Sequence, residues 1–176
     1  SVRTFGAPPL LHAVQQLPYP AWQSAFDDFY TPGLQWYWRA DFFTELSDAS
    51  IAEHESCAAA LPTLHSTMHL YPLGGAAGRV GRNDTAFSFR EARWAEVIVG
   101  VSPDAQDRER ISAWTRHSWH ALHPHSAGGA YVNFLVDEGD QRVRAAYRDN
   151  HARLARIKRL YDPDNLFRVN QNIRPG

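Results

Sequence analysis

The stretch that decides the fold class is Leu34-Gln35-Trp36-Tyr37-Trp38-Arg39-Ala40-Asp41-Phe42. Apolar residues occupy every second position, and the positions between them carry Gln, Tyr, Arg and Asp. Side chains of a β-strand point alternately to its two faces, so this period of two predicts a strand with one apolar and one polar face. Such strands are typical of a sheet that is covered on one side.

Further strands are predicted downstream. Residues 94–101 are rich in β-branched side chains, and residues 65–71 alternate, with Met68 and Leu70 on one face. The other face of that alternating segment carries Thr67, His69 and Tyr71. Shorter extended segments are predicted at residues 79–80, 85–90 and 130–136.

Helical segments are predicted between and after the strands. They cover residues 21–30, 48–61, 102–122 and 140–161. Ser47 is placed to cap the second segment, because its side-chain oxygen can accept a bond from a free N–H of the first turn. Pro163 ends the last segment, since proline lacks the N–H that a helix requires. A kink in that segment is expected at Arg148-Asp149.

This order of elements predicts an α+β fold, an antiparallel β-sheet with helices packed on one face. The second face of the sheet is then free. If the alternations hold, the free face carries Tyr37, Arg39, His69, Tyr71, Tyr131 and Asn133. Convergent aromatic and polar groups on an open sheet indicate a surface for a ligand or a partner domain.

Composition excludes several classes of function. The formal net charge of −1 gives no attraction to nucleic acid or to an anionic membrane, and no apolar run approaches the ~20 residues of a membrane helix. Cys57 is the only cysteine, which excludes an internal disulfide framework and a multi-cysteine metal site. No signal peptide is visible; the compartment is left open, with a cytoplasmic location slightly favoured.

Four histidines raise the question of a zinc site. They are His117, His120, His123 and His125. His117 and His120 would share a helix face, but no cysteine or fixed ligand pattern accompanies them. We therefore expect surface histidines and no metal.

The polar C-terminal part carries an ordered signature. Its elements are Tyr131-Val132-Asn133-Phe134, Ala146-Tyr147, Asn150, Tyr161-Asp162-Pro163, Asn165, Phe167-Arg168 and Asn170-Gln171-Asn172-Ile173. In this respect the chain resembles the berberine-bridge-enzyme-like family of FAD-linked oxidases. Residues 30–129 resemble the substrate-binding domain of that family more loosely. The resemblance divides the chain into a partial substrate-binding domain, residues 1–129, and a C-terminal segment, residues 130–176, that completes the same fold.

The resemblance also implies a reaction and a site. Enzymes of this family transfer a hydride from a small organic substrate to FAD and pass the electrons to dioxygen. Tyr131 and Asn133 match the residues that line the flavin ring, whereas Phe134 stands where many members have a tyrosine base. Substitute bases are sought among His69, Tyr71 and Tyr37, and the substrate-binding candidates are Tyr37, Arg39, His69 and Tyr71.

The segments that hold most of the FAD in that family are missing from this sequence. FAD is therefore expected in the full-length protein, with an N-terminal FAD-binding domain as partner, and is not expected to be retained by this chain alone. The leading interpretation is the C-terminal substrate-binding portion of an FAD-dependent oxidase. The alternative is a non-catalytic remnant that acts as a binding or dimerisation module, with a homodimer as its expected form.

Overall fold

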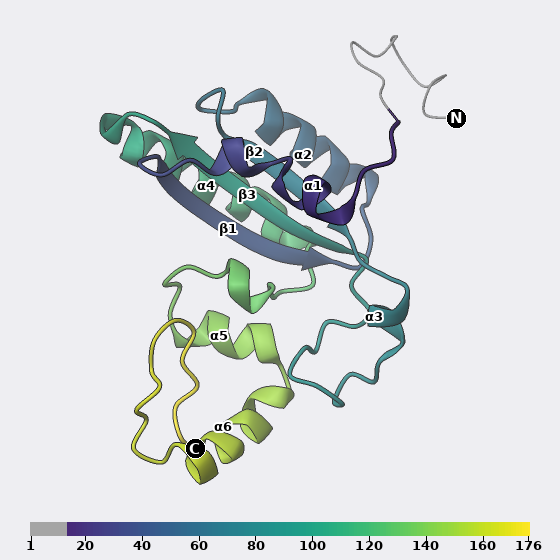
Figure 1. Cartoon of the computed structure of the whole chain (residues 1–176), viewed down its shortest axis with the longest axis vertical. Helices are drawn as coiled ribbons and strands as arrows, with labels where there is room; N and C mark the ends of the chain where they lie inside the picture. The colour runs from purple at the N-terminus through teal and green to yellow at the C-terminus, as the bar shows by residue number, and fades with distance from the viewer. Residues whose placement is uncertain (1–13) are drawn as a thin grey trace. The chain divides into compact units, whose positions relative to one another are not determined.

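The computed structural model describes residues 14–176, so the first thirteen residues of the predicted 1–129 domain lie outside the described residues (Figure 1). The chain forms two compact units, residues 1–33 and residues 34–176. The described part of the first unit contains α1 (Tyr19–Ser24) and the 3-10 helix η2 (Asp27–Tyr30). The single helix predicted over residues 21–30 is thus two short helices.

The second unit is built on a three-stranded antiparallel sheet. Its strands are β1 (Gln35–Phe43), β2 (Thr67–Pro72) and β3 (Trp94–Ser102), in the order β1-β3-β2. Each of the three longer predicted strands is found within two residues of its expected bounds. The register places Ala40, Val97 and His69 opposite one another, so these three side chains point to the same face of the sheet.

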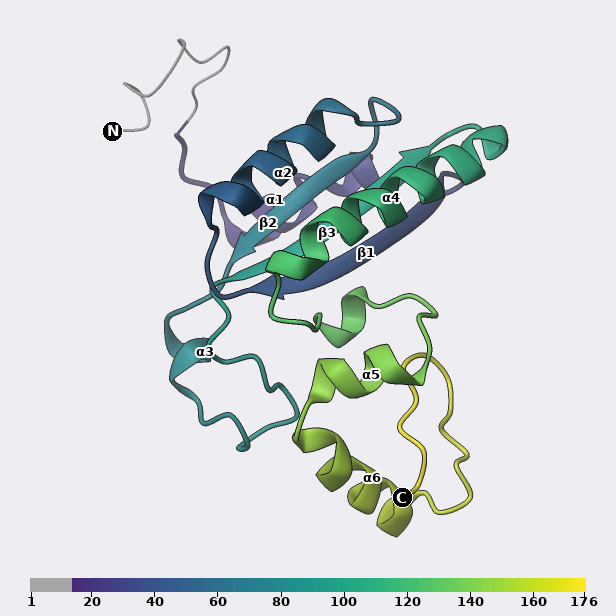
Figure 2. The same cartoon turned by 180° about the vertical axis from the view of Figure 1, so that it is seen from behind.

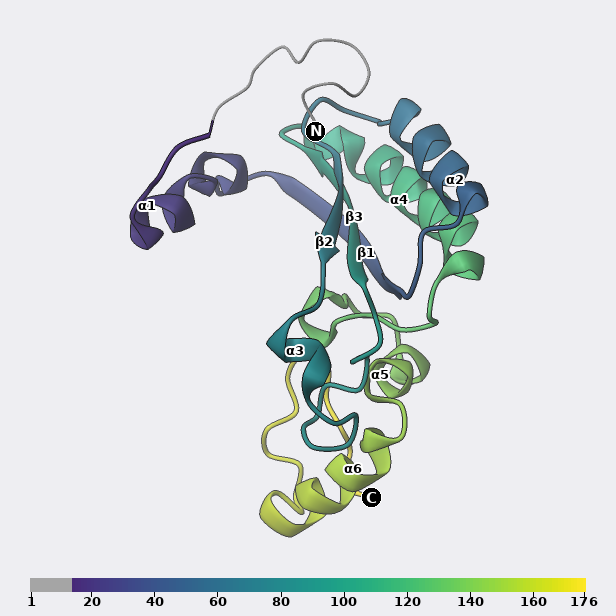
Figure 3. The ribbon, with the colours of Figure 1, turned by 90° about the vertical axis from the view of Figure 1, so that its right-hand side faces the viewer.

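Two helices cover the other face. Helices α2 (Asp48–Ala59) and α4 (Arg108–Leu122) lie on the same side of the sheet, as Figures 2 and 3 show. The core between them and the sheet contains Phe43, Cys57, Ile98, Trp114 and Leu122. Gly100 allows α4 to approach β3 closely, because a Cβ there would lie 2.7 Å from the Ile111 carbonyl oxygen. The predicted α+β fold with helices on one face is confirmed.

The predicted cap of α2 is also present. The Ser47 side chain accepts a hydrogen bond from the Ser50 backbone N–H at 3.2 Å, which satisfies a donor that has no partner within the helix. Helix α4 begins at Arg108, after the 3-10 turn η3 (Ala105–Asp107), six residues later than the predicted start at residue 102.

The rest of the unit lies at one end of the sheet (Figure 3), where part of it packs against the face opposite α2 and α4. It contains α3 (Ala76–Arg79), η4 (His123–His125), η5 (Val132–Phe134), α5 (Asp140–Tyr147) and α6 (Asn150–Tyr161). A second core joins Ala40 and Val97 to Ala130, Leu135 and Ala146. A third joins Phe42 and Ala95 to Phe89 and Ala92. This end of the open face is therefore covered by the C-terminal elements and by the loop before β3.

Three of the short predicted strands are wrong. Residues 130–136 contain the 3-10 turn η5 (Val132–Phe134) and no strand; just before them, the Gly129 carbonyl oxygen accepts a bond from the Phe42 N–H of β1 at 2.7 Å. Residues 85–90 form a loop held by side chains: the Ser88 hydroxyl donates to the Tyr147 carbonyl oxygen at 2.6 Å. Arg79 belongs to α3, so the pair 79–80 is not a strand.

The predicted kink in the C-terminal helical segment is confirmed. Arg148 separates α5 from α6 with a φ of 48°, a conformation that non-glycine residues adopt rarely. Its guanidinium is held by Glu91 and donates to the Ala127 carbonyl oxygen at 3.2 Å. The break between α5 and α6 is therefore held by contacts of Arg148 with residues outside both helices.

Candidate functional site

Strand β2 brings two of the predicted site residues to the open face of the sheet. His69 and Tyr71 lie opposite Val97 and Ala95, and their rings stack at 5.7 Å with an interplanar angle of 7°. The Thr67 hydroxyl lies 2.7 Å from His69 Nε2, which fixes the orientation of the imidazole. Both rings therefore lie on the face opposite the helices, where the alternation of residues 65–71 predicts them.

The turn η5 brings the other residues to the same place. The Phe134 ring lies between two tyrosines, with its centroid 6.0 Å from that of Tyr71 and 5.2 Å from that of Tyr131. Asn133 Nδ2 donates to the Tyr131 hydroxyl at 2.8 Å. We call this group of six residues the aromatic face: Thr67, His69, Tyr71, Tyr131, Asn133 and Phe134. Tyr71 and Tyr131 remain 42% and 38% exposed, so its rings are accessible to a ligand.

The turn, rather than strand alternation, places Tyr131 beside Asn133. The Phe134 N–H donates to the Tyr131 carbonyl oxygen at 2.8 Å, which closes the turn. Trp38 Nε1 donates to the Phe134 carbonyl oxygen at 2.9 Å and so ties the turn to β1. The sequence analysis missed this role of Trp38. The only sign of this role in the sequence was that Trp38 occupies an apolar position in the alternation of residues 34–42.

Tyr37 and Arg39 lie on the opposite face of the sheet. Arg39 is in register with Ile98, which belongs to the core under the helices, and its Nη1 forms an ion pair with Glu138 at 2.6 Å. The Thr115 hydroxyl of α4 lies 3.5 Å from the Tyr37 carbonyl oxygen. The prediction that Tyr37 and Arg39 share the open face with His69 and Tyr71 is wrong. Alternation separates the two faces of a strand, but it does not determine which face the helices cover.

A buried ionic network explains why the helices cover the polar face of β1. Asp41 Oδ2 lies 2.6 Å from His123 Nδ1, and Asp41 Oδ1 lies 3.1 Å from Arg142 Nη2. Glu96, directly opposite Asp41 in the sheet, lies 2.8 Å from His54 Nε2 of α2. Asp41 and Glu96 are each only 1% exposed. His123, expected on the surface, is therefore a structural partner of a buried carboxylate.

Two residues of this network, Glu96 and His54, have shifted pKa values. Burial raises the pKa of the Glu96 carboxyl, and the charge of Asp41 adds to this, while His54 opposes it. For His54, burial alone would lower the pKa, but the contact with Glu96 and the bond to the Ser50 carbonyl oxygen raise it overall. Both members of this pair therefore retain their protons to higher pH than free side chains do.

The pKa of His69 shifts in the opposite direction, downward. Burial lowers the pKa of His69, so its imidazole is neutral near pH 7 and can accept a proton. The neighbouring Thr67 hydroxyl is the polar group bonded to its Nε2. A neutral imidazole beside exposed aromatic rings can act as a general base toward a ligand on this face.

No group of three or more His, Cys, Asp or Glu side chains in residues 14–176 is arranged to hold a metal ion. Within the same residues, every helix is too short or too polar to cross a bilayer.

Comparison with known proteins agrees with the resemblance noted in the sequence. Residues 130–174 match the family described as Berberine and berberine like. An FAD-linked oxidoreductase of Dictyostelium discoideum is 28% identical over 176 residues, which are 99% of this chain and 38% of that protein. The uncharacterized FAD-linked oxidoreductase YgaK of Bacillus subtilis is 33% identical over 131 residues, 74% of this chain and 29% of that protein.

Solved structures share the fold. The glycopeptide hexose oxidase DBV29, complexed with teicoplanin, superposes with a TM-score of 0.72 at 20% identity, over 80% of this chain and 32% of that chain. Berberine bridge enzyme from Eschscholzia californica gives a TM-score of 0.68 at 19% identity, over 80% of this chain and 33% of that chain. The chain thus spans well under half the length of these relatives.

Proposed function

Because the chain resembles the berberine-bridge-enzyme-like FAD-linked oxidoreductases, we propose that residues 34–176 form the C-terminal substrate-binding portion of an FAD-dependent oxidase. The observation that carries the proposal is the aromatic face, where stacked rings and a carboxamide lie together opposite the helices. A small organic substrate would bind between this face and the flavin. Since the chain spans 38% of the Dictyostelium relative, an N-terminal FAD-binding domain would hold the rest of the cofactor.

The residues present fit a flat redox cofactor. The rings of Tyr131 and Phe134 offer accessible aromatic surface for a planar ring. Asn133 is exposed and uses one N–H for the Tyr131 hydroxyl, which leaves its second N–H and its carbonyl oxygen for the polar edge of the isoalloxazine. Tyr131 and Asn133 would hold the flavin ring.

When bound, FAD supplies the acceptor for a hydride that leaves a substrate carbon, and the electrons then pass to dioxygen. In this chain His69 would accept the proton of the substrate hydroxyl, because burial keeps its imidazole neutral. Thr67 would hold the ring in position, and Tyr71 would stack beside it. Phe134 has no proton to exchange. Tyr71 remains the second candidate for the base, while Tyr37 is removed because it lies on the far face of the sheet.

Binding of the isolated ring tests the flavin assignment on this chain alone. Riboflavin fluorescence is expected to be quenched on titration with the protein, with weak, saturable binding. Tyr131→Leu should weaken that binding about 2- to 10-fold, the range of an aromatic contact. Tyr161→Leu is the matched control, because Tyr161 is 80% exposed and outside the aromatic face. Absence of saturable binding, or an equal loss in both variants, would contradict the assignment.

The base assignment requires a flavin-loaded protein. A chimera can carry residues 34–176 in place of the matching region of YgaK, with peroxide release measured on a panel of alcohols and hexoses. His69→Gln should lower kcat at least about 100-fold with KM little changed and the flavin absorbance retained. His65→Gln is the control, because His65 is exposed and precedes the same strand. Unchanged turnover in His69→Gln would exclude His69 as the base.

The absence of a hydroxyl at Phe134 favours one alternative, a non-catalytic binding or dimerisation module. Tyr71 and Tyr131 are 42% and 38% exposed, and the same two residues of a second copy could pack against them. Sedimentation equilibrium over a wide concentration range tests this. A concentration-dependent dimer that is lost in Tyr131→Leu would support the module, and a monomer throughout would count against it.

A further inference from the structure

A concave site lies between the last two helices and the C-terminal tail, and it shares no lining residue with the aromatic face. The cavity has a volume of about 360 Å³. The tail is held over the helices by the Gly176 N–H, which donates to the Ala155 carbonyl oxygen at 3.3 Å, and by Gln171 Nε2, which donates to the Leu135 carbonyl oxygen at 2.9 Å. Residues of α5, α6 and the tail residues 172–176 line the cavity, which is open to solvent.

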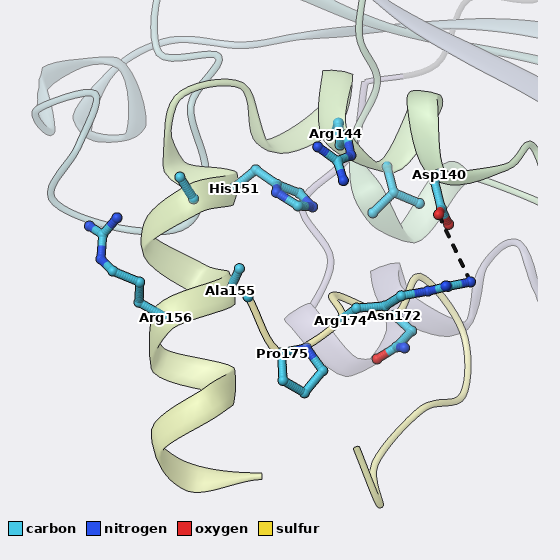
Figure 4. A pocket seen from close by; sticks show the side chains of 11 residues that line it. Asp140, Arg144, His151, Ala155, Arg156, Asn172, Arg174 and Pro175 are labelled. Atoms are coloured by element: carbon cyan, nitrogen blue, oxygen red, sulfur yellow. Dashed lines mark ion pairs between the residues drawn. The ribbon is translucent and has the colours of Figure 1, made fainter. Parts of the chain in front are cut away.

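Positively charged side chains converge on this cavity. Figure 4 shows Arg144 of α5, His151 of α6 and Arg174 of the tail directed toward the same space. Among residues 14–176, the Arg144 guanidinium has no hydrogen-bond acceptor and no ion-pair partner. Arg174 forms a weak ion pair with Asp140 at 4.0 Å, and both side chains of this pair are largely exposed. Two guanidinium groups therefore face a single carboxylate.

Helix α6 adds partial positive charge to the cavity. Burial lowers the pKa of His151, the charge of Arg144 lowers it further, and the charge of Asp140 opposes this shift. His151 and Ala152 also lie in the first turn of the twelve-residue helix α6, where the backbone N–H groups carry partial positive charge.

Part of the cavity lining is apolar. Val143 and Ala155 are 7% and 8% exposed, and Pro175 lines the cavity beside them. A volume of about 360 Å³ is larger than a bare phosphate or carboxylate needs and falls within the range of small-molecule sites. The site therefore offers room for a compact apolar group as well as for an anion.

We propose that this cavity binds a small organic anion, with its carboxylate or phosphate group held by Arg144 and Arg174 and its apolar part against Val143, Ala155 and Pro175. The planar guanidinium group pairs in a bidentate manner with either kind of oxyanion. The Asn172 amide, which also lines the cavity, adds an N–H donor. This site is independent of the flavin assignment.

Calorimetric titration of the 176-residue chain at constant ionic strength tests the proposal. The probes are benzoate and phenyl phosphate, compared with acetate and inorganic phosphate. The aromatic anions should bind saturably and more tightly than the small ones, because only they fill the apolar part. Preference for benzoate or for phenyl phosphate then identifies a carboxylate or a phosphate ester as the ligand class.

Variants connect binding to the cavity. Arg144→Gln should weaken binding about tenfold or more, the effect expected for a lost charge-assisted bond, and Arg144→Lys should weaken it less. Arg168→Gln removes the same charge from an exposed tail position outside the cavity and should leave the affinity within about twofold. Arg144→Gln should also leave riboflavin binding unchanged. No saturable binding of any probe, or an equal loss in Arg168→Gln, would overturn the proposal.

Discussion

Asn150 connects the loop before β3 to the junction of α5 and α6, and its replacement gives a sharp test of the structure. The side chain is buried, and its Nδ2 donates to the carbonyl oxygens of Arg82 and Thr85, each at 3.0 Å, and to Ser88 Oγ at 2.8 Å. The Ser88 hydroxyl donates onward to the Tyr147 carbonyl oxygen. The two hydrogens of the amide thus serve three acceptors, and all three lose their donor when the amide is removed.

The magnitude follows from these bonds. An internal hydrogen bond contributes about 1 kcal/mol net, so the loss of two full bonds and a small cavity predicts that Asn150→Ala lowers the free energy of unfolding by about 2–3 kcal/mol. In a domain of this size that corresponds to a fall in Tm of roughly 5–10 °C. Asn150→Asp keeps the shape but directs a carboxylate at three oxygens, and should cost about 1–3 kcal/mol more near neutral pH.

Urea unfolding followed by tryptophan fluorescence measures both variants, with the slope m expected to stay unchanged. In Asn150→Asp, burial raises the pKa of the introduced carboxyl above its unfolded value, so part of the loss should be recovered as the pH falls below that pKa. Asn83→Ala, at an exposed position of the same loop, should change stability by less than about 0.5 kcal/mol. The reasoning is refuted if Asn150→Ala costs under about 1 kcal/mol or if Asn150→Asp is no worse.

Three other predictions concern the sheet and its helices. Gly100→Ala should destabilise the protein by about 1–3 kcal/mol because its Cβ would overlap α4, whereas Gly74→Ala, with nothing within 4 Å, should not; thermal unfolding compares the two. Trp38→Phe removes the bond to the Phe134 carbonyl oxygen and should cost about 1 kcal/mol, with faster hydrogen exchange at the Phe134 amide; unchanged exchange would mean that the turn does not depend on Trp38. His54 has a raised pKa in the folded protein, so its contribution to stability is complete below pH 6.5 and is lost as the pH rises through the folded pKa. The free energy of unfolding of His54→Gln should therefore fall less steeply above pH 6.5 than that of the wild type. Parallel curves of unfolding free energy against pH would refute this.

Local patterns predicted the three strands and the start of α2 in the second unit. The alternation in residues 34–42, the β-branched run in residues 94–101 and the Ser47 cap specified β1, β3 and the start of α2, because each depends on the backbone geometry of a few neighbouring residues. The kink at Arg148 was also visible locally, as a break in the helical segment. The C-terminal signature indicated a resemblance to the berberine-bridge-enzyme-like family, and residues 130–174 match the family described as Berberine and berberine like.

Contacts between segments that are distant in sequence determined where the site residues lie. The sequence showed that β1 has an apolar and a polar face. We expected the helices to cover the apolar face, but α2 and α4 cover the polar one. Buried Asp41 is tolerated there because His123 and Arg142, distant in sequence, supply opposite charge and hydrogen bonds within 3.1 Å. Likewise, the bond from Trp38 to the Phe134 carbonyl oxygen, not strand periodicity, brings Tyr131 and Asn133 beside Tyr71. Such partners meet only when the chain is folded, since the free energy that selects them comes from contacts between segments that no local pattern contains.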